Sequence, residues 1–192
     1  RIAGRPGVVA AQAVGAANLA AGLQDAYLGR APVLALTGRK PLGHQHRNAY
    51  QELPHGPLFQ AVTKHAALVE RAEDFPRQLR QAWSAMLAPP PRPAHLDLHG
   101  LMGEVIERGD IPNAPLELAD WHAPRQRSIA DGLDRAAALL LGAKRVALVV
   151  GEGALLSGCG PELLALAEAL QAPIALSLGA RGIVPTRHPL HL

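Results

Sequence analysis

Three histidines stand close together in a polar stretch of the chain, where imidazole groups could bind a metal ion. His44 and His46 are separated by one residue, and His55 follows in the same stretch. Two imidazoles at this spacing can ligate Zn²⁺, but a zinc site needs at least three protein ligands. No third ligand stands at a convincing spacing, so we expect no metal site and interpret the three histidines as polar loop residues.

A second stretch with the chemistry of a binding site covers residues 12–15, Gln-Ala-Val-Gly, just before a helical pattern. Backbone N–H groups at the start of a helix, together with the positive end of the helix dipole, can hold an anion. The stretch lacks the full glycine pattern of phosphate-binding loops, so a plain strand-to-helix turn is the alternative. Asn18 has a typical N-cap side chain, and we expect the helix to run from Asn18 to about Leu28.

These residues must be positioned by two strands and the helix between them. The apolar residues after Gly7 predict a short buried strand around Val8, and residues 32–38 predict a second strand. Parallel strands joined by a helix form a βαβ unit. Ligands of such sheets bind beyond the carboxyl ends of the strands, which here fall at residues 12–15 and 37–39.

The rest of the sequence continues this alternation of helices and strands. The apolar residues of 74–87 recur at spacings of three and four, which predicts an amphipathic helix. We expect further helices over residues 54–62, 129–141 and about 161–170, and strands over residues 66–69, 94–98, 145–150 and 173–178.

Residues 101–127 contain prolines and mixed charges without periodicity, which is typical of a linker. Ser128 follows as an N-cap candidate with an acidic residue three positions later. We therefore predict an α/β fold with parallel sheets and flanking helices. The chain would comprise parts of two Rossmann-like domains, residues 1–100 and 128–192, joined by that linker.

Composition excludes several classes of protein. The chain has 192 residues with a net charge of only +3, and its basic residues are scattered rather than clustered, so we expect no nucleic-acid partner. Cys159 is the single cysteine, which rules out an internal disulfide and fits a cytoplasmic protein. No uninterrupted apolar stretch is long enough to span a membrane. A strand follows Arg1 almost at once and the last loop is short, so we expect both ends to lie within a larger fold.

Several motifs, in order, resemble the thiamine-diphosphate-dependent enzymes, most closely the acetolactate synthase group. The matching segments are Gly-Arg-Pro-Gly-Val at 4–8, Gly-Ala-Ala-Asn-Leu at 15–19, Gly-Leu-Gln-Asp-Ala at 22–26, Pro-Val-Leu-Ala-Leu-Thr-Gly at 32–38, Tyr-Gln-Glu at 50–52, Thr-Lys-His at 63–65, Arg-Pro-Ala-His-Leu-Asp-Leu at 92–98, and residues 137–189. Each segment is a weak signal, whereas their order and spacing are fairly specific.

The resemblance implies an enzyme of three α/β domains that decarboxylates 2-oxo acids and transfers the product to an acceptor. Residues 1–100 resemble the C-terminal half of the domain that binds the aminopyrimidine of thiamine diphosphate, and residues 128–192 the start of the central domain. The third domain of the family binds the diphosphate through Mg²⁺. Because the family's cofactor lies between subunits, the resemblance also implies a dimer or tetramer.

The family's catalytic residues do not fall within this chain. Its catalytic glutamate lies upstream of the segment that matches residues 4–8, and its Gly-Asp-Gly…Asn metal-binding segment lies downstream. We therefore expect no catalytic residue in the chain and no activity from the chain alone.

For the cofactor, the resemblance implies contacts at Val14, Gly15, Asn18 and Gln51. The family has Gly-Pro-Gly where this chain has Ala-Val-Gly at 13–15. Gln51 and His46 would lie on the substrate side, where an amide can orient a reacting group through hydrogen bonds.

Other polar and glycine residues have weaker functional interpretations. Glu52 does not match the catalytic glutamate, so we interpret it as solvated or salt-bridged. In flavin-binding members of the family, Gly151 and Gly153 correspond to residues that contact FAD, with a plain tight turn as the alternative. Lys64 and His65 are expected to be structural.

A rival function of another class is a non-catalytic α/β binding or assembly module with a decayed cofactor site, which the altered Ala13 and Val14 would favour. A dinucleotide-dependent dehydrogenase is a poorer match. Neither glycine-bearing loop has the complete Gly-x-Gly-x-x-Gly pattern followed by an acidic residue.

Overall fold

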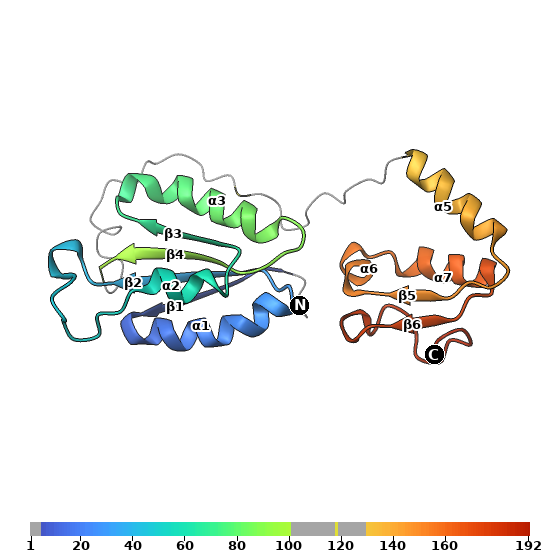
Figure 1. Ribbon diagram of the computed structural model, residues 1–192, viewed down its shortest axis with the longest axis horizontal. Coiled ribbons are helices and arrows are strands. Elements are labelled where there is room, and N and C mark those ends of the chain that lie inside the picture. The colour runs from blue at the N-terminus through green and yellow to red at the C-terminus, as the bar shows by residue number, and fades with distance from the viewer. Residues whose placement is uncertain (1–4, 101–117, 119–129) are drawn as a thin grey trace. The chain divides into compact units, whose positions relative to one another are not determined.

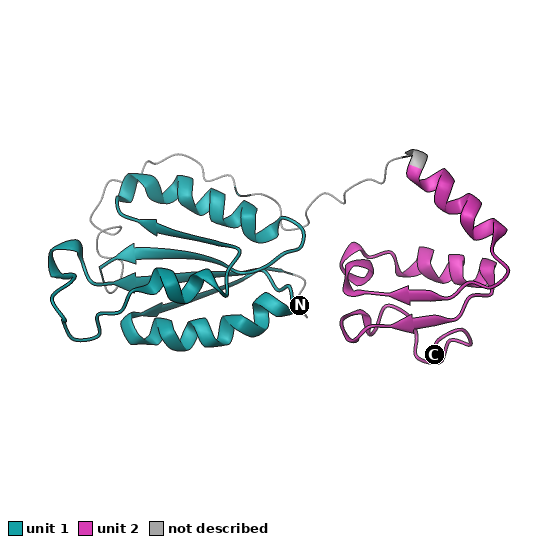
Figure 2. Ribbon diagram, viewed as in Figure 1, with its two compact units in different colours: residues 1–123 teal, residues 124–192 magenta. Residues whose placement is uncertain are grey.

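The structure is a computed structural model that describes residues 5–100, 118 and 130–192, with the side chains of residues 130 and 131 excepted. The chain divides into two compact units, residues 1–123 and 124–192 (Figure 2). The predicted N-cap Ser128 and the predicted linker at 101–127 lie outside the described residues, apart from Leu118.

The first unit is built on a four-stranded sheet in which all three strand pairings are parallel. The strand order is β1-β2-β4-β3, so β2 and β4 lie in the middle of the sheet. Its elements are β1 (Gly7–Gln12), α1 (Ala13–Leu28), β2 (Val33–Arg39), α2 (His55–Gln60), β3 (His65–Val69), α3 (Phe75–Leu87) and β4 (Ala94–His99), with short 3₁₀ helices at Leu42–His44 and Ala72–Asp74.

Helices cover both faces of this sheet (Figure 1). Leu34 and Ala35 are neighbours on β2 and point to opposite faces. Leu34 belongs to the core that includes Met86 of α3, whereas Ala35 packs with Leu23 of α1 and Phe59 of α2. A parallel strand that is buried on both faces reads as a nearly continuous apolar run, which explains the sequence of β2.

The start of the chain differs from the sequence-based expectation in two ways. Val8 is 61% exposed instead of buried, because β1 is the outer strand of the described sheet and α3 covers the face of β2, β3 and β4 on that side. Helix α1 begins at Ala13 instead of Asn18, so the predicted N-cap role of Asn18 is wrong. Ala13 takes a left-handed φ of 48°, which turns the chain directly from β1 into α1. Asn18 therefore lies inside the helix, on its exposed side.

The second unit has a smaller parallel sheet of two strands. Its elements are α5 (Ala130–Gly142), β5 (Leu148–Val150), α6 (Glu152–Ser157), α7 (Gly160–Leu170) and β6 (Ile174–Leu176), followed by a 3₁₀ turn at Leu178–Ala180. The core between these elements contains Val150, Ala167 and Ile174.

Both strands of the second unit are shorter than the predicted ranges 145–150 and 173–178, and a helix replaces the loop expected after β5. Gly151 is the N-cap of this helix, α6, and Gly158 ends it with a left-handed φ of 68°. Glycine adopts that conformation without steric cost. A six-residue helix is too short to show a clear apolar period, so periodicity could not predict it.

The predicted α/β class with parallel sheets and flanking helices is confirmed. The amphipathic helix expected over 74–87 is α3, which begins at Phe75 with proline in its first turn. Within the described residues, no helix is both long and apolar enough to cross a membrane.

Candidate functional site

Three strands of the first unit end side by side. In the register of the sheet, Gln12 of β1 lies opposite Gly38 of β2, and Gly38 lies opposite Leu98 of β4. This is the carboxyl edge, where open α/β sheets bind ligands. The turn from β1 into α1, the end of β2 and the loop that follows β2 meet at this edge.

A buried polar network links β2 to β4 just below this edge. The Thr37 hydroxyl donates to Asp97 Oδ1 at 2.7 Å, and Thr37 Oγ1 lies 2.7 Å from His95 Nε2. The three residues are 1–4% exposed. Their register brings them together, because Thr37 pairs with Asp97 and Ala35 with His95 across the two strands.

Two basic side chains, His55 from α2 and Arg39 from the end of β2, complete the network. His55, at the start of α2, is fully buried, and its Nδ1 lies 2.9 Å from Asp97 Oδ1. Its Nε2 lies 3.2 Å from the carbonyl oxygen of Ala13. Arg39 Nη1 lies 3.8 Å from the second oxygen of Asp97, and Arg39 Nη2 donates to Gln45 at 3.0 Å. Asp97 therefore connects the middle of the sheet to the β1–α1 turn.

Burial dominates the electrostatics of His95. It lowers the pKa of His95 from 6.5 to about 4; nearby Asp97 opposes this change and His55 adds to it. The ring of Phe59 stacks on the His95 ring with 3.7 Å between the centroids. His95 is thus a neutral histidine that stacks on Phe59 on one side and contacts the polar network through Thr37.

The loop after β2 is organised by one carboxylate. Glu52 accepts hydrogen bonds from the backbone N–H groups of His46, Arg47 and Ala49. These bonds hold the pKa of Glu52 below its usual value, and the bond from Ala49 has the largest effect. Glu52 is therefore neither simply solvated nor salt-bridged. Both of its carboxylate oxygens accept backbone hydrogen bonds that hold the loop in shape.

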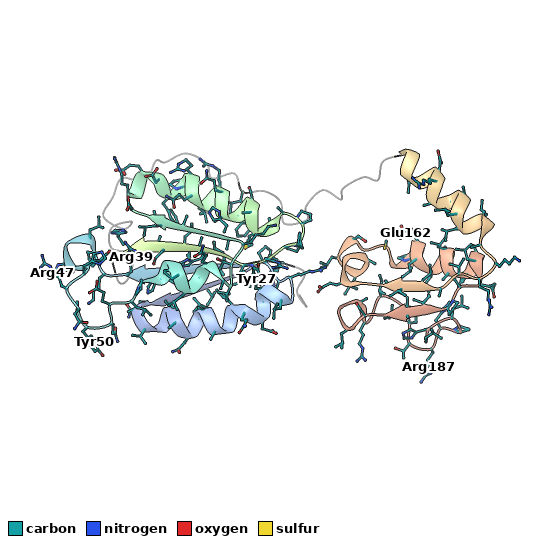
Figure 3. All side chains as sticks on the ribbon, viewed as in Figure 1. Tyr27, Arg39, Arg47, Tyr50, Glu162 and Arg187 are labelled. Atoms are coloured by element: carbon teal, nitrogen blue, oxygen red, sulfur yellow. The ribbon has the colours of Figure 1, made fainter. Side chains whose placement is uncertain are left out.

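Three residues of this loop have left-handed backbone conformations although none is glycine. The φ angles are 61° at His46, 52° at Asn48 and 60° at Gln51. Such conformations cost energy and persist where the surrounding structure holds them, often at functional sites. Figure 3 shows Arg47 and Tyr50 projecting from the outer part of the loop, and Arg39 at the end of β2.

A pocket of about 550 Å³ lies between this loop and the end of β2. Among its lining residues are Arg39, His46, Gln51 and His55. Most of its lining residues carry polar groups and several are basic, while apolar atoms make up more of its lining surface than polar atoms. One of the lining residues, His55, contacts the carbonyl of Ala13 in the β1–α1 turn.

We expect the Glu52→Ala variant to open the loop. The three backbone donors lose their charged acceptor, and hydrogen bonds to charged groups are among the stronger ones. Trypsin cleavage after Arg47 should then accelerate at least about fivefold, because proteolysis follows the population of the open form. The comparison is the initial rate of cleavage after Arg47 in the variant and the unmodified chain.

Cleavage after Arg77, in helix α3, serves as the internal reference for this experiment. The Glu52→Gln variant keeps one good acceptor and should give an intermediate rate. Equal cleavage after Arg47 in all three proteins would show that Glu52 does not hold the loop. Because folding lowers the pKa of Glu52, the loop should keep its order above pH 4.5 and lose it as the pH falls further.

The structure brings some of the predicted site residues together. His46 and Gln51 are exposed and line the same pocket. Val14 and Gly15 lie in the first turn of α1, and Val14 is 47% exposed. Asn18 lies one helical turn beyond Val14, and both side chains are exposed.

His44, Gly151 and Gly153 do not join this site. The three histidines separate: His44 and His46 are exposed, whereas His55 is buried in the network. No group of three metal-ligating side chains is found in residues 5–100, 118 and 130–192. Gly151 and Gly153 lie in the other unit, at the start of α6, and their flavin contact stays a prediction.

Sequence reasoning missed the network of Thr37, His55, His95 and Asp97. A signal was present in β4, since His95 and Asp97 alternate with apolar residues in a strand at the centre of a parallel sheet. Polar residues at such positions must find buried partners. The partners themselves could not be foreseen, because Thr37 lies 60 positions from Asp97 in the chain.

Comparison with known proteins identifies the family. The model for the N-terminal TPP binding domain of thiamine pyrophosphate enzymes matches residues 1–58, and the model for their central domain matches residues 133–192. The chain is 34% identical over its whole length to a protein from Methanocaldococcus jannaschii named as a probable acetolactate synthase large subunit. It is 31% identical over its whole length to acetolactate synthase isozyme 1 large subunit of Escherichia coli.

A solved structure supports the same assignment. A chain described as a thiamin diphosphate-dependent enzyme from Mycobacterium smegmatis superposes with a TM-score of 0.77 over 98% of this chain, at 27% identity. The chain covers 36% of that structure and 33% of each of these two relatives, so it spans about a third of their length. The predicted resemblance is confirmed: the chain belongs to the thiamine pyrophosphate enzymes and contains sequence of their N-terminal cofactor-binding domain and central domain.

Proposed function

We propose that the polypeptide containing this chain is a thiamine-diphosphate-dependent enzyme of the acetolactate synthase type, which decarboxylates a 2-oxo acid and joins the product to an acceptor. The observation that carries this proposal is the similarity to acetolactate synthase large subunits over the whole length of the chain. Because the chain spans a third of these relatives, it would supply one part of the active site.

The carboxyl edge of the first unit fits one end of this cofactor. An aminopyrimidine ring has apolar faces and polar edges. The exposed side chain of Val14 offers an apolar contact, and the first turn of a helix has N–H groups without an intrahelical acceptor. We assign the contacts with the ring to Val14, Gly15 and Asn18, with Gln51 approaching from the pocket.

The remaining residues of the site would act on the substrate. Gln51 and His46 line the pocket, where their polar groups would orient a 2-oxo acid. Arg39 also lines this pocket and adds positive charge that suits a carboxylate. When bound, thiamine diphosphate supplies the carbon nucleophile and electron sink for decarboxylation, and the protein supplies orientation and a water-poor environment.

The proposal includes three further features of the full enzyme. Mg²⁺ would hold the diphosphate, the activating glutamate would come from outside this chain, and the polypeptide would assemble as a dimer or tetramer. No relative described above is named as a flavoprotein, so FAD forms no part of the proposal.

The rival function, a binding module with a decayed cofactor site, relied on Ala13 and Val14 replacing the family's glycine and proline. Ala13 adopts a left-handed φ of 48°, which is a conformation that glycine favours. The alanine thus permits a one-residue turn from strand to helix. This observation, together with relatives named as enzymes, leaves the rival function without support.

The test is to purify the full polypeptide without cofactor and add thiamine diphosphate, Mg²⁺ and pyruvate as the simplest 2-oxo acid of this kind. We expect calorimetric binding of the cofactor and release of CO₂ that stops when the cofactor is omitted. Other 2-oxo acids should then be compared as donors and acceptors. Failure of cofactor binding, or binding without turnover of any 2-oxo acid, would refute the proposed enzyme.

A further inference from the structure

The chemistry of the side chains in the buried network determines which atoms donate protons and which accept them. The Thr37 hydroxyl has one proton, and it donates that proton to Asp97 Oδ1. At the 2.7 Å contact with His95, Thr37 can therefore only accept, so Nε2 of His95 carries the ring proton. The other ring nitrogen of His95 is buried and has no partner within the described part of the chain, which fits a neutral ring.

His55 is in the opposite situation, because both of its ring nitrogens face acceptors. Nδ1 lies 2.9 Å from Asp97 Oδ1, and Nε2 lies 3.2 Å from the carbonyl oxygen of Ala13. A carboxylate and a carbonyl can only accept. Both bonds form together only when both nitrogens carry protons, so His55 is an imidazolium.

The charged groups around His55 agree with this state. Asp97 is its direct partner on β4, and Arg39 on β2 approaches the other oxygen of the same carboxylate. The remaining titratable neighbour, His95, is neutral. One buried carboxylate thus faces one imidazolium and one guanidinium, with Thr37 as a further donor.

The bond from His55 acts on the turn between β1 and α1. The carbonyl of Ala13 and the N–H of Val14 belong to one planar peptide and point in opposite directions. A hydrogen bond that fixes the carbonyl therefore also fixes the direction of the Val14 N–H. Ala13 is 2% exposed and has the left-handed φ of 48°. Because Ala13 is the first residue of α1, its carbonyl also lies in the helix, so the bond from His55 is a second restraint on this peptide, from outside the helix.

We propose that His55 is a positioning residue of the cofactor site: as an imidazolium paired with Asp97, it holds the carbonyl of Ala13 and so orients the turn at residues 13–15 that receives the aminopyrimidine ring. This proposal rests on the proposed function. His55 does not touch the cofactor; it acts through the backbone of Ala13.

Two substitutions of His55 test its two hydrogen bonds one at a time. The amide nitrogen of glutamine lies near the place of Nε2, so His55→Gln keeps a donor for the Ala13 carbonyl. The amide nitrogen of asparagine lies near the place of Nδ1, so His55→Asn keeps a donor for Asp97 alone. Both variants lose the positive charge, which makes each the control for the other.

We expect the Kd for thiamine diphosphate, measured by calorimetry on the full polypeptide with Mg²⁺, to rise about tenfold or more in His55→Asn and less than about threefold in His55→Gln. In turnover, His55→Asn should raise the KM for the cofactor far more than it lowers kcat at saturation. Denaturation curves of both variants establish that the comparison is made between folded proteins.

A second readout does not depend on the cofactor. In ¹⁵N-labelled protein at neutral pH, both ring nitrogens of His55 should resonate as protonated nitrogens, whereas His95 should show one protonated and one bare nitrogen. A bare nitrogen on His55 would overturn the proposal. Equal cofactor affinity in the wild type and both variants would also overturn it and leave the proposed function intact. Absence of cofactor binding by the wild type would refute the proposed function itself, and the positioning role with it.

Discussion

Replacing Asp97 with alanine should lower the free energy of unfolding of the first unit by about 3–5 kcal/mol, as is typical when one partner of a buried ion pair is removed. Asp97 is 4% exposed and accepts from Thr37 and His55. Without it, the imidazolium that we propose at His55 has no counterion, and Arg39 loses its only carboxylate within 4.0 Å among the described residues. The uncompensated charge at His55 should cost more than the loss at Arg39, because Arg39 is partly exposed and keeps its bond to Gln45.

Urea denaturation monitored by tryptophan fluorescence can measure this loss. Trp83 packs against the core beneath α3 and reports on the first unit, provided that Trp121 is first replaced with phenylalanine. The matched control is Asp74→Ala, because Asp74 makes an exposed ion pair with Arg77 at 2.9 Å. Such a pair contributes about 0–1 kcal/mol. If the two aspartate variants unfold at the same urea concentration, Asp97 does not hold the network together.

Much of the fold followed from local patterns in the sequence. Helix α3 and strand β2 were predicted because each buries side chains with a regular period, three to four residues in the helix and a continuous apolar run in the strand. The burial of Leu34 and Ala35 against opposite layers is the physical reason why that run contains no polar residue before Thr37.

The start of α1 could not be predicted from the same patterns. Side-chain preference placed the N-cap at Asn18, but the helix begins at Ala13 because the chain turns there through a left-handed φ of 48°. Alanine rarely adopts that conformation. One contact of its carbonyl is remote in sequence, since His55 lies 42 positions away.

The candidate site, too, could be predicted only in part from the sequence. The location of the site at the ends of β1 and β2 follows from the βαβ pattern. The geometry of the site depends on Asp97, which contacts Thr37 and His55 because β4 lies between β2 and β3 in the sheet. Sequence alone gives no strand order, so Asp97 looked like one polar residue in a strand rather than the centre of a network.

Acid should weaken the first unit through His95. The pKa of this residue is about 4 in the folded protein, lowered from 6.5 chiefly by burial. Between these two pH values the unfolded chain binds a proton that the folded chain does not, so stability falls as the pH falls. Each pH unit costs about 1.4 kcal/mol for one proton, which amounts to about 3 kcal/mol between pH 6.5 and pH 4.

Unfolding free energies measured at several pH values test this expectation. Burial also lowers the pKa values of His65 and His99, so the unmodified chain should lose more stability in acid than His95 alone accounts for. The matched variant is His95→Gln, whose amide can donate to Thr37 and does not titrate. Its stability should depend less steeply on pH, and the difference from the unmodified chain should level off above pH 6.5 and below pH 4. Parallel pH profiles would mean that His95 takes up its proton without disturbing the fold. The Thr37 hydroxyl would then have to tolerate an imidazolium neighbour, and the Phe59 ring a cation stacked on it.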